Sequence, residues 1–369
     1  MSERRVGIVG YGVMGRAHAY AYRTAPLIRP SATTFVPVAV SGRDAVRVGA
    51  AAASMGVEAM TDWRALVERA DVDVVDICTP PGTHSLIAVA AAAAGKDVIC
   101  EKPLAVTALE AAQALEAVRS AGVRHAVGFN YRRLPALSLM AQLISEGALG
   151  EIRLWRGTWL SDEFVDAAIP FDWRFERSMG GTTIADLGSH LVDLALWMVG
   201  PIVEVSATSS TFVTSRDSPE GPRMVEVDDA SSALLKFAAG AQGTLEVARS
   251  APRRPCDFVV EVNGSRGTAI FSYARLNELW VGYVDEDPRH YGLRRIRVEH
   301  PSHPQTAGWW PLGQGVGYDA SLVNQAADLA AAWPDGSYEP DFVQGAAVVD
   351  VCAAMERSAA ERHWIHVAP

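Results

Sequence analysis

The chain has 369 residues, of which 49% are hydrophobic and 21% charged, and its formal net charge is −10 at pH 7. This length and apolar content suffice for two domains, each with its own core. The negative charge, with arginine pairs scattered rather than gathered in one run, argues against nucleic acid or an anionic membrane as a partner. The longest apolar run, around Ile87–Ala94, is too short to span a bilayer.

Cysteine usage and the N-terminus indicate the compartment. The four cysteines show no CxxC pairing and no metal-site spacing, and apolar residues surround them, so we expect reduced thiols and no bound metal. The first residues lead directly into a short apolar strand, with no room for a signal peptide. We therefore expect a cytoplasmic protein.

Short apolar strands alternate with helices over residues 1–128. The pattern predicts strands at Val6–Val9, Phe35–Val40, Val72–Cys78 and Val98–Cys100. The predicted helices are one that starts near Val13, one that ends at Gly56, one capped by Thr61 or Asp62, one over His84–Ala94, and one that runs from a Thr107/Glu110 capping box and ends before Gly122. Strand–helix alternation at this spacing predicts a parallel sheet with helices on both faces. We assign residues 1–128 to a doubly wound α/β domain.

Residues 129–369 contain longer strands and fewer helices. The pattern predicts strands at Ile152–Trp159, Val203–Val213, Ser231–Phe237, Gly243–Arg249, Phe258–Val262 and Thr268–Tyr273, a hairpin turn at Asn263-Gly264, and helices at Pro135–Ser145, Thr183–Val199, Gly315–Ala331 and Asp341–Ser358. This is an α+β domain with a large, mostly antiparallel sheet that is open on one face. A second subunit could cover that face in a homodimer or homotetramer, and the helix at 341–358 could pack back on the first domain.

A glycine-rich segment, Gly10-Tyr11-Gly12-Val13-Met14-Gly15, follows the first strand and opens the first helix. Gly10 permits a tight turn, Gly12 lets the backbone approach a pyrophosphate, and Gly15 lets helix and strand pack closely. Its position at the first strand–helix junction favours dinucleotide binding over a simple turn. We assign Gly10, Gly12, Val13, Met14 and Gly15 to the cofactor.

The end of the second strand bears on the choice of nicotinamide cofactor. NAD sites usually place an acidic residue there, whereas this chain has Ser41-Gly42-Arg43-Asp44. Ser41 and Arg43 could hold a 2′-phosphate, which favours NADP. In the alternative, Arg43 is solvated, Asp44 is only a helix cap, and NAD remains open.

Two further segments carry reactive side chains. Lys102, in Glu101-Lys102-Pro103, follows a buried strand at the edge where doubly wound folds bind ligands, and its ammonium could stabilise an alkoxide. Asp186, His190 and Asp193 are spaced four and three residues apart and so share one helix face. Asp186 can orient His190, whose imidazole exchanges protons near neutral pH, while Asp193 fits a structural role.

Together these motifs resemble the glucose–fructose oxidoreductase/inositol dehydrogenase (Gfo/Idh/MocA) family over essentially the whole chain. The resemblance extends to Cys78-Thr79-Pro80 with His84, to Gly128–Arg133 and to Trp173-Arg174-Phe175. Within the family the chain looks most like the levoglucosan-dehydrogenase type of sugar dehydrogenase, through Asn130–Arg133 and the Gly308–Tyr318 loop. In that type we expect glutamine and tryptophan near the positions of Ser161 and Glu163. This chain lacks both, so the identity of the sugar stays open.

The resemblance implies a nicotinamide-dependent oxidoreductase with a Rossmann domain. Lys102, Asp186 and His190 correspond to the catalytic set. The residues implied near the cofactor, in addition to the glycines, Ser41 and Arg43, are Thr79, Pro80, His84, Glu101, Lys102, Trp173 and Arg174. The residues implied near the substrate are Lys102, Asn130, Tyr131, Arg132, Ser161, Asp186 and His190.

We therefore expect hydride transfer between NAD(P)(H) and a ring carbon that bears a hydroxyl group, in a sugar, anhydrosugar or cyclitol. His190 would remove the hydroxyl proton and Lys102 would stabilise the oxyanion, although the sequence leaves open which of the two acts as the primary base. Two alternatives remain: a redox-cycling glycosidase or lyase on the same fold, and a non-catalytic cofactor-binding sensor.

Overall fold

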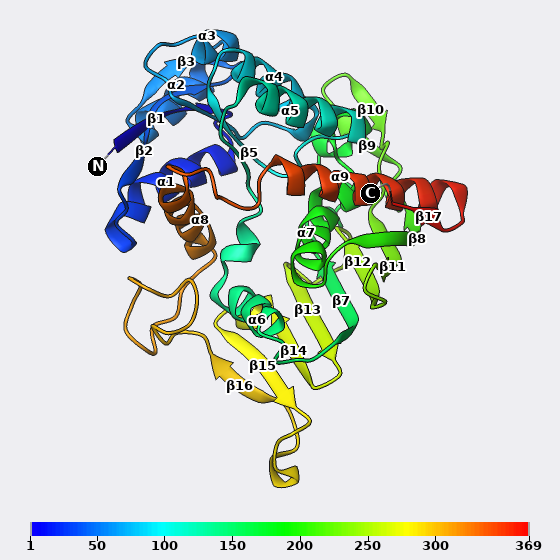
Figure 1. The fold of residues 1–369 in the computed structure, drawn as a ribbon. Helices are drawn as coiled ribbons and strands as arrows, with labels where there is room; N and C mark the ends of the chain where they lie inside the picture. Colours follow the sequence, from blue (N-terminus) through cyan, green and yellow to red (C-terminus); the bar gives the residue numbers. More distant parts are fainter. Residues whose placement is uncertain (1, 368–369) are drawn as a thin grey trace. The chain divides into compact units, whose positions relative to one another are not determined.

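A computed structural model of the chain describes residues 2–367, which form two compact units (Figure 1). The first unit runs to residue 133 and also contains residues 307–309 and 317–347. The second contains residues 134–306, 310–316 and the chain from 348 onward. After our boundary at residue 128, the chain thus returns to the first unit, and the returning part includes the start of the helix that we expected at 341–358 to pack on that domain.

The described part of the first unit is built on a parallel sheet with the strand order β3-β2-β1-β4-β5-β6. Its elements are β1 (Ser2–Val9), α1 (Val13–Ile28), β2 (Thr33–Ser41), α2 (Ala45–Met55), β3 (Glu58–Met60), α3 (Trp63–Val67), β4 (Val74–Ile77), α4 (His84–Ala93), β5 (Asp97–Cys100), α5 (Ala108–Ala121), β6 (His125–Val127) and α8 (Asp319–Ala332). The helices α1, α2 and α8 share one hydrophobic core with β1 and β2, while α4 packs against α3, α5 and the strands β4 and β5. The predicted doubly wound α/β domain is confirmed.

Local signals set several helix ends in this unit. Asp44 caps α2 by accepting hydrogen bonds from two backbone N–H groups, and Gly56 ends the helix in the left-handed conformation. Thr107 and Glu110 form the predicted capping box of α5, which Gly122 terminates in the same way as Gly56.

The described part of the second unit is built on a sheet with the order β16-β15-β14-β13-β7-β12-β11-β8-β17. Its elements are α6 (Pro135–Ser145), β7 (Ile152–Leu160), a π-helical turn (Ile184–Gly188), α7 (Ser189–Met198), β8 (Ile202–Ser210), a hairpin of β9 (Ser215–Ser218) and β10 (Gly221–Met224), β11 (Ala230–Phe237), β12 (Gln242–Ala248), β13 (Asp257–Gly264), β14 (Gly267–Ser272), β15 (Glu278–Tyr283), β16 (Arg294–Arg297) and β17 (Ile365–His366). The helix α9 (Phe342–Glu361) begins in the first unit and continues in the second.

Neighbouring strands of this sheet are antiparallel, except that β7 and β12 run parallel. The helices α6 and α7 pack against the sheet, whereas Leu154 of β7 and Leu234 of β11 are 37% and 51% exposed. In β11 and β12, exposed and buried residues alternate. The predicted α+β domain with an open-faced, mostly antiparallel sheet is confirmed.

The hairpin turn predicted at Asn263-Gly264 is wrong. Both residues belong to β13, Asn263 pairs with Thr268, and the chain turns at residues 265–266. A Cβ atom at Gly264 would lie 2.0 Å from the carbonyl oxygen of Leu149. This glycine therefore permits a close approach of two backbones instead of a turn.

The helix predicted to begin at Gly315 also starts later than we expected. Gly315 has a φ of +62°, which is incompatible with a right-handed helix, and α8 begins only at Asp319.

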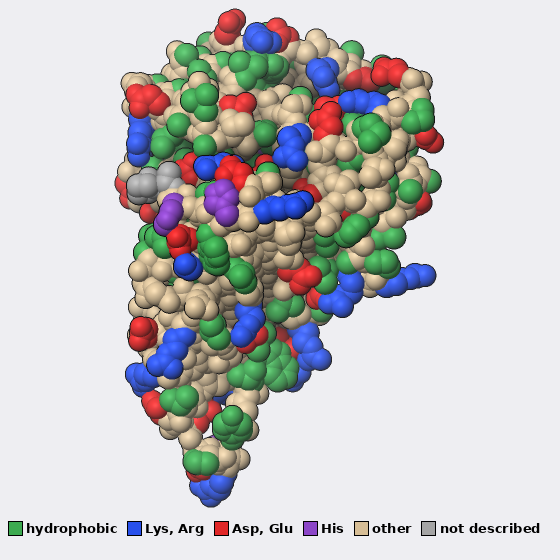
Figure 2. All heavy atoms as spheres, turned by 90° about the vertical axis from the view of Figure 1, so that its right-hand side faces the viewer, with side chains coloured by type: hydrophobic (Ala, Val, Ile, Leu, Met, Phe, Trp, Pro, Cys, Tyr) green, Lys and Arg blue, Asp and Glu red, His purple; other side chains and the backbone are tan. Residues whose placement is uncertain are grey.

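The surface and the helix lengths bear on possible partners. On the face drawn in Figure 2, lysine and arginine side chains are interspersed with aspartate and glutamate. Among residues 2–367, every helix is too short or too polar to cross a lipid bilayer.

Candidate active site

The glycine loop, residues 10–15, lies at the carboxyl ends of the central strands of the first unit. The N–H of Gly10 donates to the carbonyl of Ser41 over 2.9 Å, and the N–H of Cys78 donates to the carbonyl of Val9 over 2.8 Å. Gly10 has a φ of +113°, and a Cβ atom there would lie 2.4 Å from the carbonyl oxygen of Cys78. The turn therefore requires glycine at this position.

The other two glycines of the loop differ in what surrounds them. A Cβ atom at Gly15 would lie 2.0 Å from the carbonyl oxygen of Gly10, so α1 approaches the loop only because residue 15 is glycine. At Gly12, the N-cap of α1, an added Cβ would meet nothing within 4 Å. Val13, 72% exposed, and Met14 open the helix, and within the described chain no N-cap side chain satisfies its N–H groups. An exposed helix N-terminus beside open space suits an anionic pyrophosphate.

The end of β2 adjoins the glycine loop because β1 and β2 pair along their whole length. Ser41 is 1% exposed, and its Oγ has no hydrogen-bond partner among the described residues. Arg43 is exposed, while the carboxylate of Asp44 is committed to the cap of α2. The groups at this edge that could meet a ribose or a 2′-phosphate are therefore a hydroxyl and a guanidinium.

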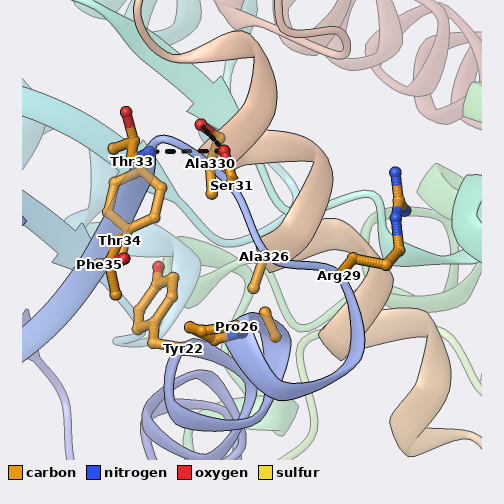
Figure 3. Close-up of a pocket in the computed structure, with 10 residues that line it drawn as sticks. Tyr22, Pro26, Arg29, Ser31, Thr33, Thr34, Phe35, Ala326 and Ala330 are labelled. Atoms are coloured by element: carbon orange, nitrogen blue, oxygen red, sulfur yellow. Dashed lines mark hydrogen bonds between the residues drawn. The ribbon is translucent and has the colours of Figure 1, made fainter. Parts of the chain in front are cut away.

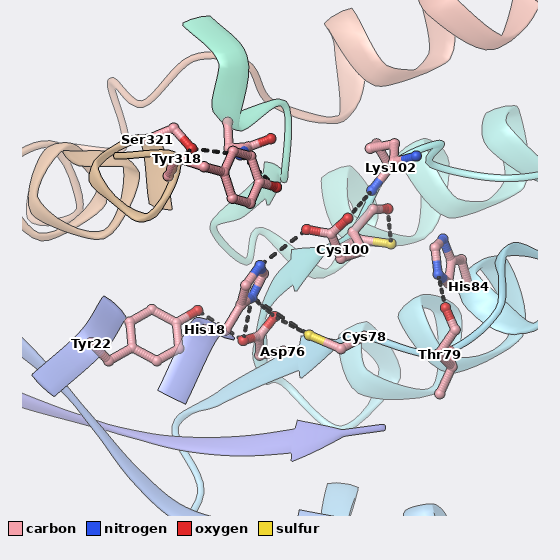
Figure 4. Close-up of polar contacts among 12 residues, drawn as sticks. His18, Tyr22, Asp76, Cys78, Thr79, His84, Cys100, Lys102, Tyr318 and Ser321 are labelled. Atoms are coloured by element: carbon pink, nitrogen blue, oxygen red, sulfur yellow. Dashed lines mark hydrogen bonds and ion pairs between the residues drawn. The ribbon is translucent and has the colours of Figure 1, made fainter. Parts of the chain in front are cut away.

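His84 connects the loop after β4 to the loop after β5. Its Nδ1 lies 2.8 Å from the carbonyl oxygen of Pro103, and its Nε2 lies 2.8 Å from the carbonyl oxygen of Thr79 (Figure 4). The side chain is completely buried, and burial lowers the pKa of the ring. His84 thus supports these loops from behind, while Thr79 and Pro80 are only partly buried.

Lys102 directly follows β5, so it lies at the same edge of the parallel sheet as the glycine loop. It is half-buried, and its peptide bond to Pro103 is cis. The preceding Glu101 is 6% exposed, and its Oε2 accepts a hydrogen bond from the backbone N–H of Lys102 over 3.3 Å. The dinucleotide motif and the candidate catalytic ammonium therefore share one sheet edge.

Asn130, Tyr131 and Arg132, which the resemblance implied near the substrate, are 2%, 6% and 3% exposed. The Asn130 amide donates to the hydroxyl oxygens of Ser321 over 2.7 Å and Tyr318 over 3.1 Å. The rings of Tyr131 and Tyr318 lie 5.8 Å apart. The contacts of this segment therefore hold the start of α8.

In the second unit, Asp186 lies in the π-helical turn and His190 in the first turn of α7. We predicted a helix over Thr183–Val199, and the backbone is helical from residue 183 to Met198. Within it, Ile184–Gly188 form the π-helical turn, a feature that is frequent at functional sites. The His190 ring is 6% exposed and stacks on Trp159, with ring centroids 5.4 Å apart and an interplanar angle of 27°. Asp193 is 1% exposed, which fits the structural role we expected for it.

Arg249 is a residue of this site that the sequence analysis missed. Its guanidinium is completely buried and lies 3.9 Å from the carboxylate of Asp186. It also donates to the carbonyl of Asp228 over 3.0 Å and lies 5.0 Å from the ring of Phe164. A signal existed: every second residue of β12 points inward, and Arg249 continues that alternation. Arg249 therefore places a buried positive charge beside Asp186.

Two segments that the sequence analysis assigned to the site lie near Asp186 and Arg249. Ser161 is buried, and its Oγ accepts a hydrogen bond from the N–H of Glu163 over 3.2 Å. Partial burial, and then the negative charge of Asp186, raise the pKa of Glu163. The guanidinium of Arg174 lies 4.5 Å from the ring centroid of Trp173 and is partly exposed. The second unit thus gathers one imidazole, two carboxylates and cationic side chains.

A small pocket elsewhere in the first unit is a different feature. Tyr22, Phe35, Arg29 and Ala330 are among its lining residues, between α1, β2 and α8, and Ser31 donates to the Ala330 carbonyl over 3.0 Å (Figure 3). It lies at the amino end of β2. Doubly wound sheets bind ligands at the opposite, carboxyl edge, so this pocket is not our candidate site.

Two family models match the chain. Residues 4–129 match the model described as "Oxidoreductase family, NAD-binding Rossmann fold", and residues 138–270 match the "GFO/IDH/MocA C-terminal domain". The two matches together cover most of both units.

Individual proteins are similar over the full length. The chain is 36% identical to levoglucosan dehydrogenase of Pseudarthrobacter phenanthrenivorans, with 100% of the chain and 99% of the relative covered. It is 27% identical to inositol 2-dehydrogenase of Rhizobium meliloti, with 99% of both covered. A solved structure of levoglucosan dehydrogenase in complex with NADH and levoglucosan is 36% identical, covers 100% of both chains and has a TM-score of 0.96.

Proposed function

Because the chain belongs to the Gfo/Idh/MocA family of oxidoreductases, we propose that it is a dehydrogenase acting on a ring secondary alcohol of a sugar, anhydrosugar or cyclitol. The observation that carries the proposal is the placement of Lys102 at the sheet edge that also bears the glycine loop. Relatives named as levoglucosan and inositol dehydrogenases support the substrate class.

The residues of the first unit fit a bound nicotinamide dinucleotide. Gly12 leaves open space beside the uncapped N-terminus of α1, and Ser41 Oγ is a buried hydroxyl with no partner among the described residues. Gly10, Gly12, Val13, Met14 and Gly15 would hold the pyrophosphate, and Ser41 with Arg43 the adenosine ribose. Thr79, Pro80, Trp173 and Arg174 would adjoin the nicotinamide, with His84 and Glu101 behind them. A nicotinamide held by these residues would supply the acceptor, or in the reverse direction the donor, of the hydride on the carbinol carbon.

The chain's own reactive groups handle the proton. His190 removes the proton of the substrate hydroxyl, and Lys102 stabilises the negative charge that develops on the same oxygen. Asp186 orients His190, and the Arg249 guanidinium lies 3.9 Å from the Asp186 carboxylate. Ser161 and the Asn130–Arg132 segment shape the substrate end of the site.

The finer choice of cofactor is a separate proposal. NADH is bound in the solved levoglucosan dehydrogenase structure. In this chain the exposed Arg43 and the hydroxyl of Ser41 occupy the position where NAD sites usually carry an acidic residue, which supports use of NADP as well.

Gly12→Ala tests the dinucleotide site without disturbing the fold. Gly12 has a φ of −67°, which alanine tolerates, and the added methyl group meets no protein atom within 4 Å. It would project into the space assigned to the pyrophosphate. We expect NADH affinity, measured by fluorescence titration, to fall at least about tenfold, or about 1.4 kcal/mol. The unfolding free energy should change by less than about 0.5 kcal/mol.

Gly49→Ala is the matched control for this variant. Gly49 lies inside α2, where an added Cβ also meets nothing within 4 Å. It should bind NADH normally and gain about 0.5–1 kcal/mol in stability, because alanine favours a helix. NADH affinity unchanged by Gly12→Ala would place the pyrophosphate elsewhere.

The open face of the second unit supports a homo-oligomer. Leu154, Leu234 and Trp364 are 37%, 51% and 39% exposed and line one groove on β7, β11 and β12. Exposed apolar residues that lie close together on the open face of a sheet are typical of a subunit interface. We propose a dimer or tetramer through this face, which sedimentation velocity measures directly.

A substrate panel tests the proposed function. Levoglucosan, L-sorbose, myo-inositol and common aldoses would be incubated with NAD and with NADP, and reduced nicotinamide followed by absorbance. We expect at least one ring alcohol to be oxidised. Wild-type protein that binds NADH but releases a cleaved sugar without net cofactor reduction would instead indicate a redox-cycling glycosidase or lyase.

A further inference from the structure

We propose that His18 is a positioning residue for Lys102: its ring, held between Asp76 and Glu101, fixes the Glu101 carboxylate against the Lys102 backbone and sets the charge that Lys102 faces. The inference rests on the proposed function, in which Lys102 acts on the substrate oxygen. It concerns a buried network of the first unit, made of His18, Tyr22, Asp76, Cys78 and Glu101 (Figure 4).

Each ring nitrogen of His18 faces a carboxylate. Nδ1 lies 2.9 Å from Oδ2 of Asp76, in the middle of β4, and Nε2 lies 3.0 Å from Oε1 of Glu101, just after β5. His18 is 2% exposed, Asp76 0% and Glu101 6%. The ring therefore bridges two neighbouring strands of the sheet from α1, without access to water.

This arrangement requires a doubly protonated ring. A neutral imidazole has one N–H and one lone pair, so with both carboxylates ionised its unprotonated nitrogen would oppose an acceptor oxygen. Burial by itself lowers the pKa of His18, but the charge and hydrogen bond of Asp76 outweigh that cost, and the pKa is raised well above its usual value. An imidazolium between two carboxylates leaves the network with a net charge of about −1.

The network reaches Lys102 through Glu101. One oxygen of Glu101 contacts His18 and the other accepts the backbone N–H of Lys102 over 3.3 Å. The space for this carboxylate exists because residue 128 is glycine: a Cβ atom there would lie 2.6 Å from Glu101 Oε1. His18 thus immobilises a carboxylate adjacent in sequence to the candidate catalytic ammonium. His84, whose pKa is lowered by burial, is a further titratable group near Lys102.

The same atoms raise the question of a metal site, because the ligand atoms of His18, Asp76 and Cys78 all lie within 4.8 Å of one another. The hydrogen bonding argues for a proton network instead. Cys78 Sγ lies 3.6 Å from Asp76 Oδ1, and burial, followed by the Asp76 charge, raises the pKa of Cys78 to about 12. The ligand atoms of the three residues already contact one another through hydrogen bonds.

Tyr22 provides a matched control within the same network. Its hydroxyl donates to Asp76 Oδ2 over 2.9 Å, one turn along α1 from His18, and Tyr22 is 3% exposed. Tyr22→Phe therefore removes a buried hydrogen bond to the same carboxylate but leaves Glu101 untouched. A purely structural network would make Tyr22 and His18 equivalent, whereas our inference makes only His18 affect Lys102.

The test measures Lys102 itself. The reaction of each lysine with acetic anhydride would be followed against pH by peptide mass spectrometry, in the full-length protein, with Lys96, whose ammonium donates to the carbonyls of Arg69 and Val72, as internal reference. In His18→Gln, the Glu101 carboxylate is no longer shared with an imidazolium and acts fully on Lys102. We expect the Lys102 profile to move up by about one pH unit, so that labelling on its rising limb falls about tenfold. Tyr22→Phe should leave labelling within about twofold of wild type.

Glu101→Gln shows whether His18 acts through Glu101. This variant should move the Lys102 profile to lower pH, because it removes a neighbouring negative charge. Adding His18→Gln to Glu101→Gln should then change nothing further. An equal upward shift in both backgrounds, or a His18→Gln profile no different from that of Tyr22→Phe, overturns the inference.

Two measurements on wild-type protein complete the test and do not depend on any variant folding. Nitrogen NMR of histidine-labelled protein should show both His18 ring nitrogens protonated at pH 8, and a neutral ring would reject the inference. Elemental analysis should find no stoichiometric zinc, and one equivalent per chain that is absent from His18→Gln would establish a metal site instead. Since none of these readouts needs a substrate, failure of the sugar panel rejects the proposed function alone.

If the sugar panel identifies a substrate, steady-state kinetics provide an independent test of the inference. His18→Gln should lower kcat about tenfold while NADH affinity stays within about threefold. A loss confined to NADH affinity would show that His18 serves α1 and the glycine loop rather than Lys102, and would overturn the inference.

Discussion

His190→Ala is expected to lower kcat for sugar oxidation by about 10²–10⁴-fold, the range that a positioned general base contributes. NADH affinity should stay within about threefold of wild type, because His190 lies in the second unit whereas the glycine loop lies in the first. Its ring is 6% exposed and stacked on Trp159, so its orientation is fixed before substrate binds. Stopped-flow or steady-state absorbance of the reduced nicotinamide measures the loss.

His366→Ala is a suitable control for this variant. His366 lies on β17 in the same unit, with a side chain 84% exposed, and should keep full activity. Added imidazole should partly restore turnover to His190→Ala, because truncation of the ring leaves space beside Trp159. Turnover equal to that of wild type in His190→Ala would move the general base elsewhere, with Lys102 the next residue to test.

Lys102→Met should lower kcat/KM by about 10²–10³-fold, the usual cost of removing one group that stabilises a developing oxyanion. Methionine keeps the length and apolar stem of lysine, so the half-buried position stays filled. The substitution therefore removes mainly the positive charge of the Lys102 ammonium. NADH titration and kcat/KM for the best sugar from the panel would be measured together.

The control for the charge is Lys236→Met. Lys236 lies on β11, about half exposed, and pairs with Glu204. Its loss should leave kcat/KM unchanged and affect stability by about 1 kcal/mol or less, as for other surface ion pairs. If Lys102→Met instead weakens only NADH binding while kcat is retained, Lys102 is a cofactor ligand and not an oxyanion stabiliser.

Helix boundaries were predictable where a local signal sets them. The caps of α2 at Asp44 and of α5 at Thr107 involve contacts within three residues, and both are present in the structure. Strands without an apolar core face were not predictable. β16, Arg294–Arg297, is almost entirely charged, and it is a strand only because it pairs with β15. Such an element has no signal of its own.

The same distinction between local and distant contacts applies to the candidate site. The glycine loop was predictable because its three glycines lie in one strand–helix junction at a recognisable spacing. The network around His18 was not, since it joins α1, β4 and the end of β5. Signals were present in retrospect: Asp76 interrupts an otherwise apolar buried strand, and His18 lies on the buried face of α1 between Gly15 and Tyr22.

By itself the sequence predicted most of the strands and helices in their order, the dinucleotide motif at residues 10–15, and Lys102, Asp186 and His190 as candidate reactive residues. These features depend on side-chain periodicity and on neighbours a few residues away. Only the tertiary structure decided that α8 returns to the first unit, that Arg249 lies beside Asp186, and that His18 lies between two carboxylates. Those contacts join segments tens to hundreds of residues apart, and burial, which removes competing water, is what makes their charges matter.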